Sequence, residues 1–545
     1  MESTKKTNII FNTMAILLII IFAFTVSQKT LQNDTFYTIK IGEYIVNNGI
    51  TMQDPFSWHD LSYTFPHWAY DVMIYLIYSI GGHLGIYIST IVFSSILGLL
   101  MFLINDKFTN NKSVSFVLTI GALFLLKDFI AARAQLFTFI LFAIELLCIE
   151  GFLETSKKRY VFGLLIVPVL IANFHVAVFP FYFVLYLPYI AEYIIYCMFD
   201  IKGIIEKKIK KINKMITKTT DEQKLEKLNN RLEQLTKKQQ NYKSKKSYKI
   251  LISKKENTKA LIIIMIVCLF TGLLSPLGLT PYTYLVKTLQ GNSTSNISEH
   301  LPLTLANNVV YACVLILFIT ILTFTDTKIR LCDLFMLGGL TVLTFMSRRQ
   351  ESMFIIMCVP IFNRLVTSFL RKYDKEGIEQ MKILMTTICG IIVTTCIVLI
   401  LSAMAYKNKY KDDYISKSSY PVEASEWILN NLNLDEIKIY NGYNYGSYLL
   451  FKGIPVFVDS RCDLYLPEFN NDVHVFDDFL TISGLGTKKL EERFDKYGFT
   501  HFVVYANEKL TIYLDAKSDI YNKIYNDDNF AIYERVLNVG DLIEE

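Results

Sequence analysis

Long apolar runs, separated by short polar segments, recur along the first three quarters of the chain. A helix of about 18 apolar residues or more can cross a hydrocarbon layer roughly 30 Å thick. The pattern predicts eleven such helices, at approximately 9–27, 84–104, 113–127, 134–153, 160–174, 176–199, 259–279, 305–325, 331–347, 352–370 and 383–405. Two of them, 113–127 and 160–174, are short enough to be broken or merged spans. We therefore expect residues 1–405 to form a mainly α-helical membrane domain.

Lysine and arginine cluster in polar segments that eleven spans would place on one side of the membrane. These segments are 105–112, 157–159, 202–255, 328–330 and 364–382. The positive-inside rule assigns that side to the cytoplasm. The first span is expected to be retained, because no small-x-small cleavage pattern follows it. The pattern thus predicts a multi-pass plasma-membrane protein with a cytoplasmic N-terminus and an extracellular C-terminus.

One polar insertion interrupts the spans. Residues 201–258 hold about 18 Lys and Arg against 6 Asp and Glu, and their Ile and Leu residues recur at helical spacing. This pattern predicts a basic cytoplasmic hairpin of two antiparallel amphipathic helices. The hairpin is interpreted either as a contact for a partner or anionic lipid, or as a solvated insertion with no such role.

The composition changes after Ala405. Residues 406–545 hold about 15 Lys and Arg against 24 Asp and Glu, with mixed helix and strand patterns. We expect helices at 421–431 and 488–497, and strands at 438–440, 455–458, 501–505 and 529–535. Their alternation predicts a small soluble α/β domain, extracytoplasmic by the same count of spans.

The overall composition narrows the function classes. The chain of 545 residues is 52% hydrophobic with a net charge of +5, which is more apolar than a soluble protein of this length. Its nine cysteines form no disulfide or zinc-binding pattern, and no phosphate-binding glycine loop occurs. Because the basic patch is confined to one short hairpin, nucleic-acid binding is not expected.

The first outer loop, residues 33–82, carries the first candidate chemistry. Helical spacing predicts two short helices on the membrane surface, ending at Asn48-Gly49 and Gly81-Gly82. Carboxylates and histidines frame the loop, and the candidate catalytic residues are Asp34, Asp54 and Asp71, with His67 beside them. Each aspartate also has a structural interpretation: a helix N-cap for Asp34, a turn for Asp54 and a surface ion pair for Asp71.

Candidate binding residues lie near the outer ends of later spans. Arg133, Arg348 and Arg349 suit an anionic group, since guanidinium matches phosphate geometry, although arginines at span ends also snorkel to the interface. Other candidates are His175 beside Asn173, Glu299-His300, Asp459 and Arg461. His175 and Glu299-His300 are also explained by packing, and Asp459 and Arg461 by an ion pair that fixes their loop.

The ordered set of motifs resembles bacterial membrane glycosyltransferases of the GT-C superfamily, which include protein O-mannosyltransferases and aminoarabinose transferases. The similar stretches cover nearly the whole chain except 201–258. They are Asp34-x-x-Tyr37, Gly42-Glu43, Asp54-Pro-Phe-Ser57, His67-Trp-x-x-Asp71, Arg133-Ala-Gln135-Leu, Asn173-Phe-His175, Arg348-Arg349, Asn441 to Gly446 and Asp459-Ser-Arg461-x-Asp463. Ala134 stands where the family usually has proline.

The resemblance implies an inverting hexosyl or pentosyl transferase with a GT-C-like arrangement of helices. Its donor would be a polyprenyl-phosphate-linked sugar from the membrane lipid phase, and its acceptor an extracytoplasmic glycan or protein. By position, Asp34 is the family's candidate base. The arginines would hold the lipid phosphate as it gains charge. The family includes enzymes with and without a divalent cation, and no ligand cluster in the sequence decides between them.

Two other classes of function remain as alternatives. A lipid-linked glycan transporter or flippase would use ionisable groups inside the spans, for which Glu145 and Glu192 are the candidates. A non-catalytic membrane subunit would use the C-terminal domain as a binding module and would tolerate loss of the loop carboxylates.

Overall fold

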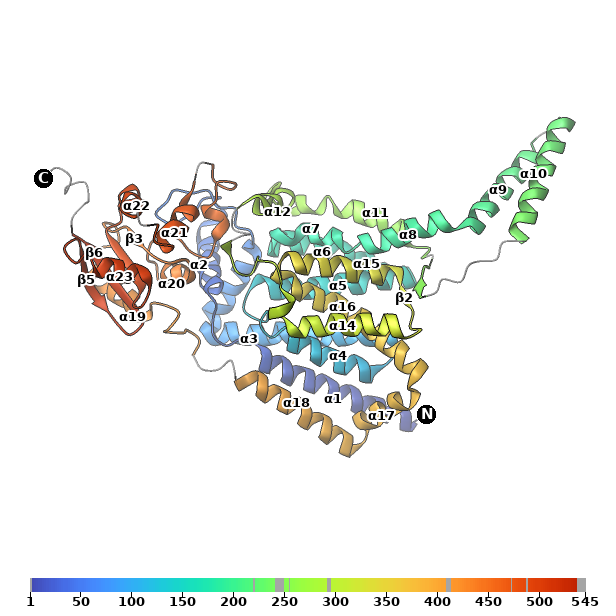
Figure 1. Cartoon of the computed structure of the whole chain (residues 1–545), viewed down its shortest axis with the longest axis horizontal. Coiled ribbons are helices and arrows are strands. Elements are labelled where there is room, and N and C mark those ends of the chain that lie inside the picture. The colour runs from blue at the N-terminus through green and yellow to red at the C-terminus, as the bar shows by residue number, and fades with distance from the viewer. Residues whose placement is uncertain are drawn as a thin grey trace.

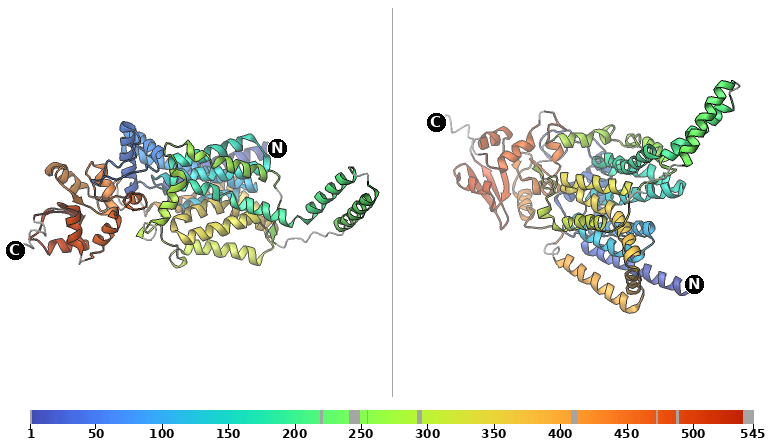
Figure 2. Two further views of the ribbon diagram at one scale, coloured as in Figure 1. Left: turned by 90° about the horizontal axis from the view of Figure 1, so that it is seen from above. Right: turned by 45° about the vertical axis from the view of Figure 1, so that its right-hand side comes forward.

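A computed structural model of the chain describes residues 2–218, 221–240, 249–253, 255–291, 296–407, 413–471, 473–486 and 489–536. Its three parts follow one another along the long axis of the molecule (Figure 1). A bundle of roughly parallel helices lies in the middle, the C-terminal domain lies at one end, and a helical hairpin projects from the other. Two further views show the same order (Figure 2).

The bundle contains a helix at each apolar run that the sequence pattern marks. Its helices are α1 (Glu2–Val26), α3 (Trp68–Thr109), α4 (Lys112–Leu125), α5 (Ala134–Thr155), α6 (Lys158–Phe174), α7 (Phe179–Val184), α8 (Leu187–Phe199), α11 (Thr258–Cys268), α12 (Thr280–Gln290), α14 (Val309–Phe324), α15 (Leu331–Met346), α16 (Glu351–Tyr373), α17 (Lys375–Thr386) and α18 (Ile388–Lys407). Short 3₁₀ turns join several of them: η1 (Val176–Val178), η2 (Thr271–Leu274), η3 (Leu305–Asn307) and η4 (Arg348–Gln350).

Among the described residues, six helical stretches are long and apolar enough to span a membrane. They are Ile9–Val26, Trp68–Thr109, Ala134–Thr155, Val176–Phe199, Arg348–Tyr373 and Ile388–Tyr406. Four shorter apolar helices, α4, α11, α14 and α15, accompany them. The fold is therefore mainly helical with several candidate spans, and the count of eleven stays a prediction.

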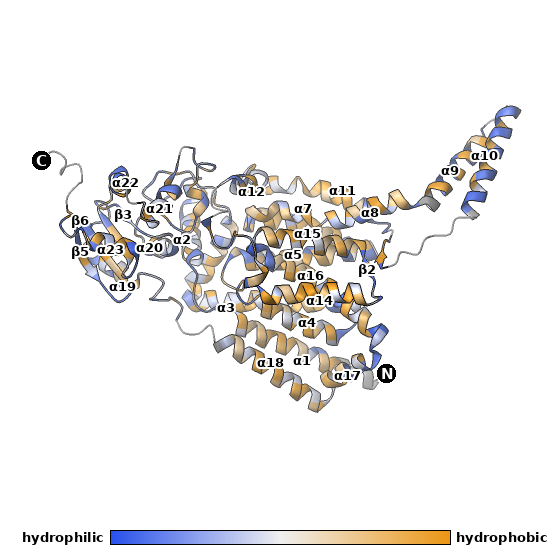
Figure 3. Ribbon diagram, in the orientation of Figure 1, coloured by the Kyte–Doolittle hydropathy of each residue, from blue (hydrophilic) through white to orange (hydrophobic). Residues whose placement is uncertain are grey.

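The outer surface of the bundle is apolar, as the hydropathy colouring shows (Figure 3). On α14, Ile316 and Ile319 are each 62% exposed, and Ile388 on α18 is 79% exposed. Large apolar faces of this kind are unfavourable in water and mark a lipid or protein contact. This surface supports a membrane environment.

Several of the expected spans are not single helices, and two of them illustrate the cause. The run 176–199 divides into η1, α7 and α8, with proline in the first turn of α7 and of α8. The run 259–279 ends as α11 at Cys268 and continues as η2 before Ser275. Proline disfavours the helical conformation in the residue before it, which accounts for the end of η2 before Pro276.

Four charged residues form an ion-pair cluster in the bundle near its hairpin end. Sequence analysis did not identify this cluster. Arg330 lies 2.5 Å from Glu150 on α5 and 2.6 Å from Asp333 on α15, and Arg364 of α16 lies 2.5 Å from Asp333. The two positive and two negative charges balance one another. Since breaking a buried ion pair is costly, the cluster fixes α5, α15 and α16 relative to one another.

The first loop contains helix α2 (Asn33–Asn48), which packs beside the start of α3. α2 ends at Gly49, as predicted, with Gly49 at φ +78°. α3 (Trp68–Thr109) is interrupted at Gly82, whose backbone is non-helical (φ +57°), so one helical segment ends at Gly81-Gly82 as predicted and a second continues to Thr109. The expected surface position of α2 needs correction, because its apolar face is covered by protein: Phe36 is wholly buried against rings of the C-terminal domain.

The C-terminal domain is a four-stranded sheet with helices around it. The helices are α19 (Val422–Asn431), α20 (Tyr443–Phe451), α21 (Val475–Ser483), α22 (Leu490–Tyr497) and α23 (Lys509–Asp515), with the 3₁₀ turn η5 (Cys462–Tyr465). The strands are β3 (Ile439–Tyr440), β4 (His501–Tyr505), β5 (Tyr521–Asn526) and β6 (Phe530–Arg535), in the order β3-β4-β6-β5. β3 and β4 are parallel, and the other pairs are antiparallel.

Most of the elements expected in this domain are present. α19, β3, β4, α22 and β6 lie where the pattern placed them, although the expected start of α22 at Lys488 falls outside the described residues. The strand expected at 455–458 is absent: Val456 forms only an isolated bridge to Ser57 of the first loop. The segment is buried because it packs beneath that loop, which explains its strand-like apolar pattern.

The basic insertion forms α9 (Ile201–Ile216) and α10 (Glu222–Gln240), which pack against each other as the amphipathic pattern predicts. The hairpin and the N-terminus lie at the same end of the bundle (Figure 1). Strands β1 (Ile250–Leu251) and β2 (Ile329–Arg330) pair in parallel near the base of the hairpin.

Candidate functional site

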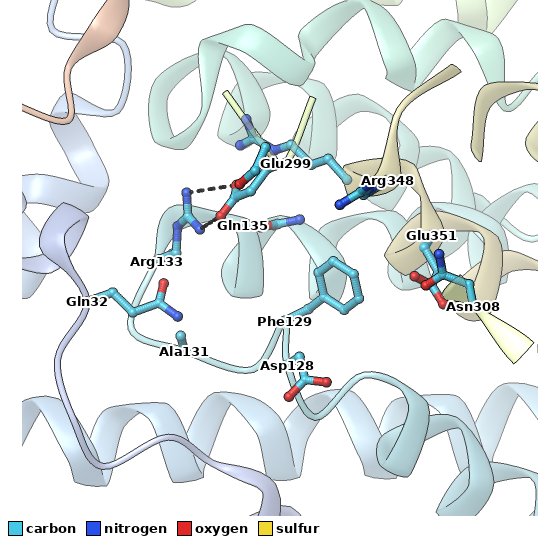
Figure 4. Close-up of a pocket in the computed structure, with 12 residues that line it drawn as sticks. Gln32, Asp128, Phe129, Ala131, Arg133, Gln135, Glu299, Asn308, Arg348 and Glu351 are labelled. Atoms are coloured by element: carbon cyan, nitrogen blue, oxygen red, sulfur yellow. Dashed lines mark hydrogen bonds and ion pairs between the residues drawn. The ribbon is translucent and has the colours of Figure 1, made fainter. Parts of the chain in front are cut away.

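A pocket of about 320 Å³ opens at the end of the bundle nearest the C-terminal domain. Its walls come from the ends of several bundle helices and the loops that join them (Figure 4). The lining residues are Gln32, Asp128, Phe129, Ala131, Arg133, Gln135, Ser298, Glu299, Asn308, Arg348, Arg349 and Glu351. The three arginines singled out from the sequence therefore share one cavity.

Arg133 joins two carboxylates at the mouth of this pocket. Its Nη2 lies 2.5 Å from Oδ2 of Asp34, and its Nη1 lies 3.0 Å from Oε1 of Glu299. Asp34 is held there because it occupies the first turn of α2. Arg133 immediately precedes α5, after the turn that follows α4. The two ends of the bridge come from segments about 265 residues apart in the sequence.

The loop that carries Glu299 is pinned to the turn that carries Arg348 and Arg349. The backbone amide of Arg349 donates to the carbonyl of Glu299 at 3.1 Å, and that of Arg348 donates to Leu301 at 3.0 Å. Within the described residues, neither the Arg348 nor the Arg349 guanidinium has a carboxylate within 4.0 Å. These two charges lack the neutralising partners that Arg133 has.

The electric field of the arginines alters the titration of their neighbours. Burial would raise the pKa of Glu299, but Arg133 outweighs it and holds the pKa below its usual range. Burial and then Arg349 lower the pKa of His300 to about 4. At neutral pH, Glu299 is therefore ionised and His300 is uncharged.

A second group of predicted residues lies near these arginines. His67, which precedes α3, has Nδ1 3.8 Å from Oδ1 of Asp71. Its ring stacks on Tyr37 and meets the edge of His175 at a centroid distance of 5.5 Å. His175 is also within 2.9 Å of the Thr138 hydroxyl on α5. The structure therefore brings His67 and Asp71 from the start of α3 together with His175 from the α6–η1 junction.

Asp54, Asp459 and Arg461 form a separate group at the junction of the first loop and the C-terminal domain. Arg461 Nη1 lies 2.5 Å from Asp54 and its Nη2 lies 2.7 Å from Asp459, with both carboxylates wholly buried. Tyr465 also donates to Asp459 at 2.7 Å. The ion pair expected between Asp459 and Arg461 is thus present, and Asp54 completes it. None of the three lines the pocket.

The C-terminal domain also contacts the bundle through η5. The Tyr284 hydroxyl on α12 donates to Asp463 at 2.6 Å. Burial raises the pKa of Asp463, while Tyr284 and Arg349 act in the opposite direction. The influence of Arg349 places this edge of the C-terminal domain close to the pocket.

Sequence reasoning did not identify Asp128, Glu351 or Asn308 as pocket residues. Asp128 follows Lys127 at the end of an apolar run, and Glu351 follows Arg349 at the start of another. Polar residues at the ends of spans were the available signal. Their common location depends on the packing of helices distant in sequence.

Among the described residues, no group of three or more His, Cys, Asp or Glu side chains is arranged to hold a metal ion. The groups lining the pocket that can donate to an anion include the arginines and the amides of Gln32, Gln135 and Asn308. A comparison of the chain with known protein families and with curated proteins found no match. The resemblance to GT-C enzymes thus stays a prediction based on the motifs.

Proposed function

We propose that the protein is an integral membrane glycosyltransferase of the GT-C type. It transfers a sugar from a polyprenyl-phosphate donor to an acceptor on the extracytoplasmic side. The observation that carries this proposal is the pocket at one end of the bundle, where Arg348 and Arg349 have no carboxylate partner among the described residues and lie beside the Asp34–Arg133 pair.

The arginines suit the donor phosphate. A phosphate with one lipid substituent keeps negative charge at neutral pH and gains more as the sugar–oxygen bond breaks. Guanidinium groups donate paired, charge-assisted hydrogen bonds to such oxygens. Arg348 and Arg349 are available for this contact, while Asp34 and Glu299 hold Arg133 in a fixed orientation beside them.

The carboxylates of the pocket suit the sugar. Asp128, Glu299 and Glu351 line the same pocket as the arginines (Figure 4). Carboxylate oxygens accept hydrogen bonds from hydroxyl groups, so they can orient a polyhydroxyl ring. The C-terminal domain, which reaches the bundle through Asp463 and Tyr284, would position the glycan or protein acceptor.

The topology that this function requires combines eleven spans with an extracytoplasmic C-terminal domain. It is supported by the location of the basic hairpin and the N-terminus at the end of the bundle away from the pocket (Figure 1). A lipid-linked donor would enter the pocket from the membrane phase between helices, and the acceptor would approach from the C-terminal domain.

A transporter of lipid-linked glycans is the second candidate, and one observation favours it. Glu145 on α5 is wholly buried, and neither of its carboxylate oxygens has a hydrogen-bond partner in the described part of the chain. An ionisable group within a span commonly marks a transport pathway. A transporter would move the lipid-linked sugar across the bilayer without breaking it.

The decisive experiment offers the purified full-length protein a panel of polyprenyl-phosphate sugars with candidate acceptors. A transferase releases free polyprenyl phosphate, which mass spectrometry detects. Arg349→Gln should weaken polyprenyl-phosphate binding about 10- to 100-fold, as expected for a lost charged hydrogen bond of about 1.5–3 kcal/mol. Arg231→Gln, on the distant helix α10, is the matched control. Translocation of intact donor across vesicle membranes, without release, would replace the transferase by the transporter.

A further inference from the structure

We infer that His67, supported by Asp71, is the base that takes the proton from the acceptor hydroxyl. The inference rests on the proposed transferase function and deepens it. The sequence offered Asp34 for this task, but Oδ2 of Asp34 is already engaged by Arg133 at 2.5 Å. His67 and Asp71 have no comparable engagement.

The geometry of the pair is that of a histidine held by a carboxylate. Asp71 is wholly buried, and neither of its oxygens has a hydrogen-bond partner among the described residues, although the Thr38 hydroxyl lies nearby. The buried Nδ1 of His67 also has none, and it faces Oδ1 of Asp71 at 3.8 Å. A shift of about 1 Å would join them, and catalytic hydrogen bonds are often long before substrate binds.

His67 lies beside the arginine pocket rather than in its lining, and Nε2 is the ring nitrogen that is not turned toward Asp71. The side chain is 17% exposed, whereas its Nδ1 is buried toward Asp71. Tyr37 stacks on one side of the ring, and His175 meets it edge-on. A carboxylate behind Nδ1 fixes the tautomer in which Nε2 carries the free lone pair.

Two arginine charges act on His67, Arg349 on η4 and Arg133 before α5, while Asp71 on α3 and the ring of His175 lie beside it. Burial first, and then Arg349 and Arg133, lower the pKa of His67 to about 3. At neutral pH the imidazole of His67 is therefore uncharged. A donor phosphate bound at the arginines would offset their positive field, and the pKa of His67 would rise. Donor binding would thus strengthen the base just when an acceptor can be used.

The proposed step is balanced. Nε2 of His67 removes the proton of an acceptor hydroxyl while that oxygen forms a bond to the anomeric carbon of the sugar. The bond from that carbon to the phosphate oxygen breaks, and polyprenyl phosphate leaves with the electron pair. The imidazolium is stabilised by Asp71 and returns its proton to solvent after the products leave.

The first test measures carbethoxylation of each histidine in the full-length protein, by peptide mass spectrometry across pH. The reagent modifies accessible neutral imidazole. His67 should remain reactive down to about pH 4, well below the pKa of about 6.5 of an unperturbed imidazole. The exposed His474 serves as the control. Polyprenyl phosphate should slow the reaction at His67 and raise the pH at which it begins, while the reaction of the exposed His474 stays unchanged. An unmodified His67 at pH 7, or no effect of polyprenyl phosphate on its reaction, would overturn the inference.

The second test uses the donor and acceptor that the panel identifies. His67→Asn should lower kcat about 10²- to 10⁴-fold, the usual contribution of a general base, with little change in donor KM. Added imidazole should partly restore turnover of His67→Ala, which a purely structural role would not allow. Asp71→Asn should lower kcat less. Thermal unfolding checks that each variant folds.

The outcomes separate the two proposals. If the wild-type protein turns over the donor and His67→Asn does so at the same rate, only the assignment of His67 fails. If the wild type neither binds polyprenyl phosphate nor releases it from any donor, the proposed transferase function is wrong. The assignment of His67 as its base is then wrong as well.

Discussion

At the residue scale, the arginines of the pocket differ in how far they are neutralised. Burial alone would lower the pKa of Arg133. The ion pairs with Asp34 and Glu299 outweigh burial and raise that pKa. Arg348 and Arg349 have no such partners in the described residues, although they lie on the same wall. Arg133 therefore acts as a fixed part of the site, and the other two are the cations available to an incoming anion.

The Asp34–Arg133 pair can be tested by a substitution that keeps the shape of the side chain. Asp34→Asn should abolish most donor turnover, at least about 100-fold, because Arg133 loses its orientation. Its stability should change by less than about 1 kcal/mol, since the pair is partly exposed. Turnover and thermal unfolding are measured together, with Asp413→Asn as control, because it breaks the solvent-exposed pair with Lys29. Retained turnover in Asp34→Asn would remove this residue from the site.

Asp54 should behave in the opposite way. Its carboxylate is wholly buried against Arg461, and removing one partner of a buried pair costs on the order of 3–5 kcal/mol. Asp54→Asn should therefore lower the unfolding temperature markedly, and any loss of turnover should follow the loss of folded protein. A variant that is fully stable but inactive would instead support the catalytic interpretation of Asp54.

The same pair gives the junction a defined response to acid. Burial would raise the pKa of Asp54, but Arg461 prevails and lowers it below the usual value. A carboxylate whose pKa is lowered by folding stabilises the fold at pH values above its pKa in the unfolded chain, about 3.9. This stabilisation is lost as the pH falls through the pKa of the folded protein. Unfolding measured from pH 7 to pH 3 should show a loss of stability below about pH 4. Asp54→Asn should show a shallower loss, and identical slopes would contradict this account.

At the element scale, α2 and α3 hold Asp34 and Asp71 in register through a close approach at Gly42. A Cβ at this position would lie 2.1 Å from the Asp71 carbonyl oxygen and 2.6 Å from the Cβ of Tyr75. No alanine fits there unless the two helices move apart. The glycine is thus required by the packing of the helices.

Gly42→Ala should destabilise the protein by about 1–3 kcal/mol through overpacking and should lower turnover as well. Gly81→Ala is the matched control, since a Cβ at Gly81 meets nothing within 4 Å. Thermal unfolding and donor turnover of the two variants are compared. If the two variants had the same unfolding temperature and turnover, the close approach of α2 and α3 would contribute nothing to stability or activity.

The elements also show which features sequence can predict. β4 is correct to the residue because His501–Tyr505 is a short run of strand-forming residues bounded by turns. Pro455–Val458 has an equally apolar pattern, yet it packs beneath the first loop without joining the sheet. The sequence pattern indicates that a segment is buried, but it does not indicate which part of the protein covers it.

The same limit applies to the candidate site. Asp34, Arg133 and Arg349 were identifiable because charges at the ends of apolar spans are conspicuous. The ion pairs of Arg133 with Glu299 and of Asp54 with Arg461 could not be predicted, because each pair joins segments that are distant in the chain. The surface position expected for α2 failed for a related reason: an amphipathic helix shows that one face is covered but not whether lipid or protein covers it.

At the scale of the whole molecule, the two ends of the bundle have different character. One end carries the pocket and the C-terminal domain, and the other carries the N-terminus and the basic hairpin (Figure 1). The hairpin and the C-terminal domain are more polar than the bundle between them (Figure 3). This separation is what a protein with one cytoplasmic and one extracytoplasmic end requires.

The proposed function depends on which end faces outward, and that orientation can be measured in intact cells. A membrane-impermeant maleimide should label a cysteine introduced at exposed Asp528 of the C-terminal domain, in a variant without native cysteines. A cysteine at Lys237 of α10, whose side chain is 70% exposed, should react only after the cells are permeabilised. The positive-inside rule predicts this result because the hairpin's many lysines resist translocation. Labelling of position 237 in intact cells would place the pocket on the cytoplasmic side and exclude transfer to an extracytoplasmic acceptor.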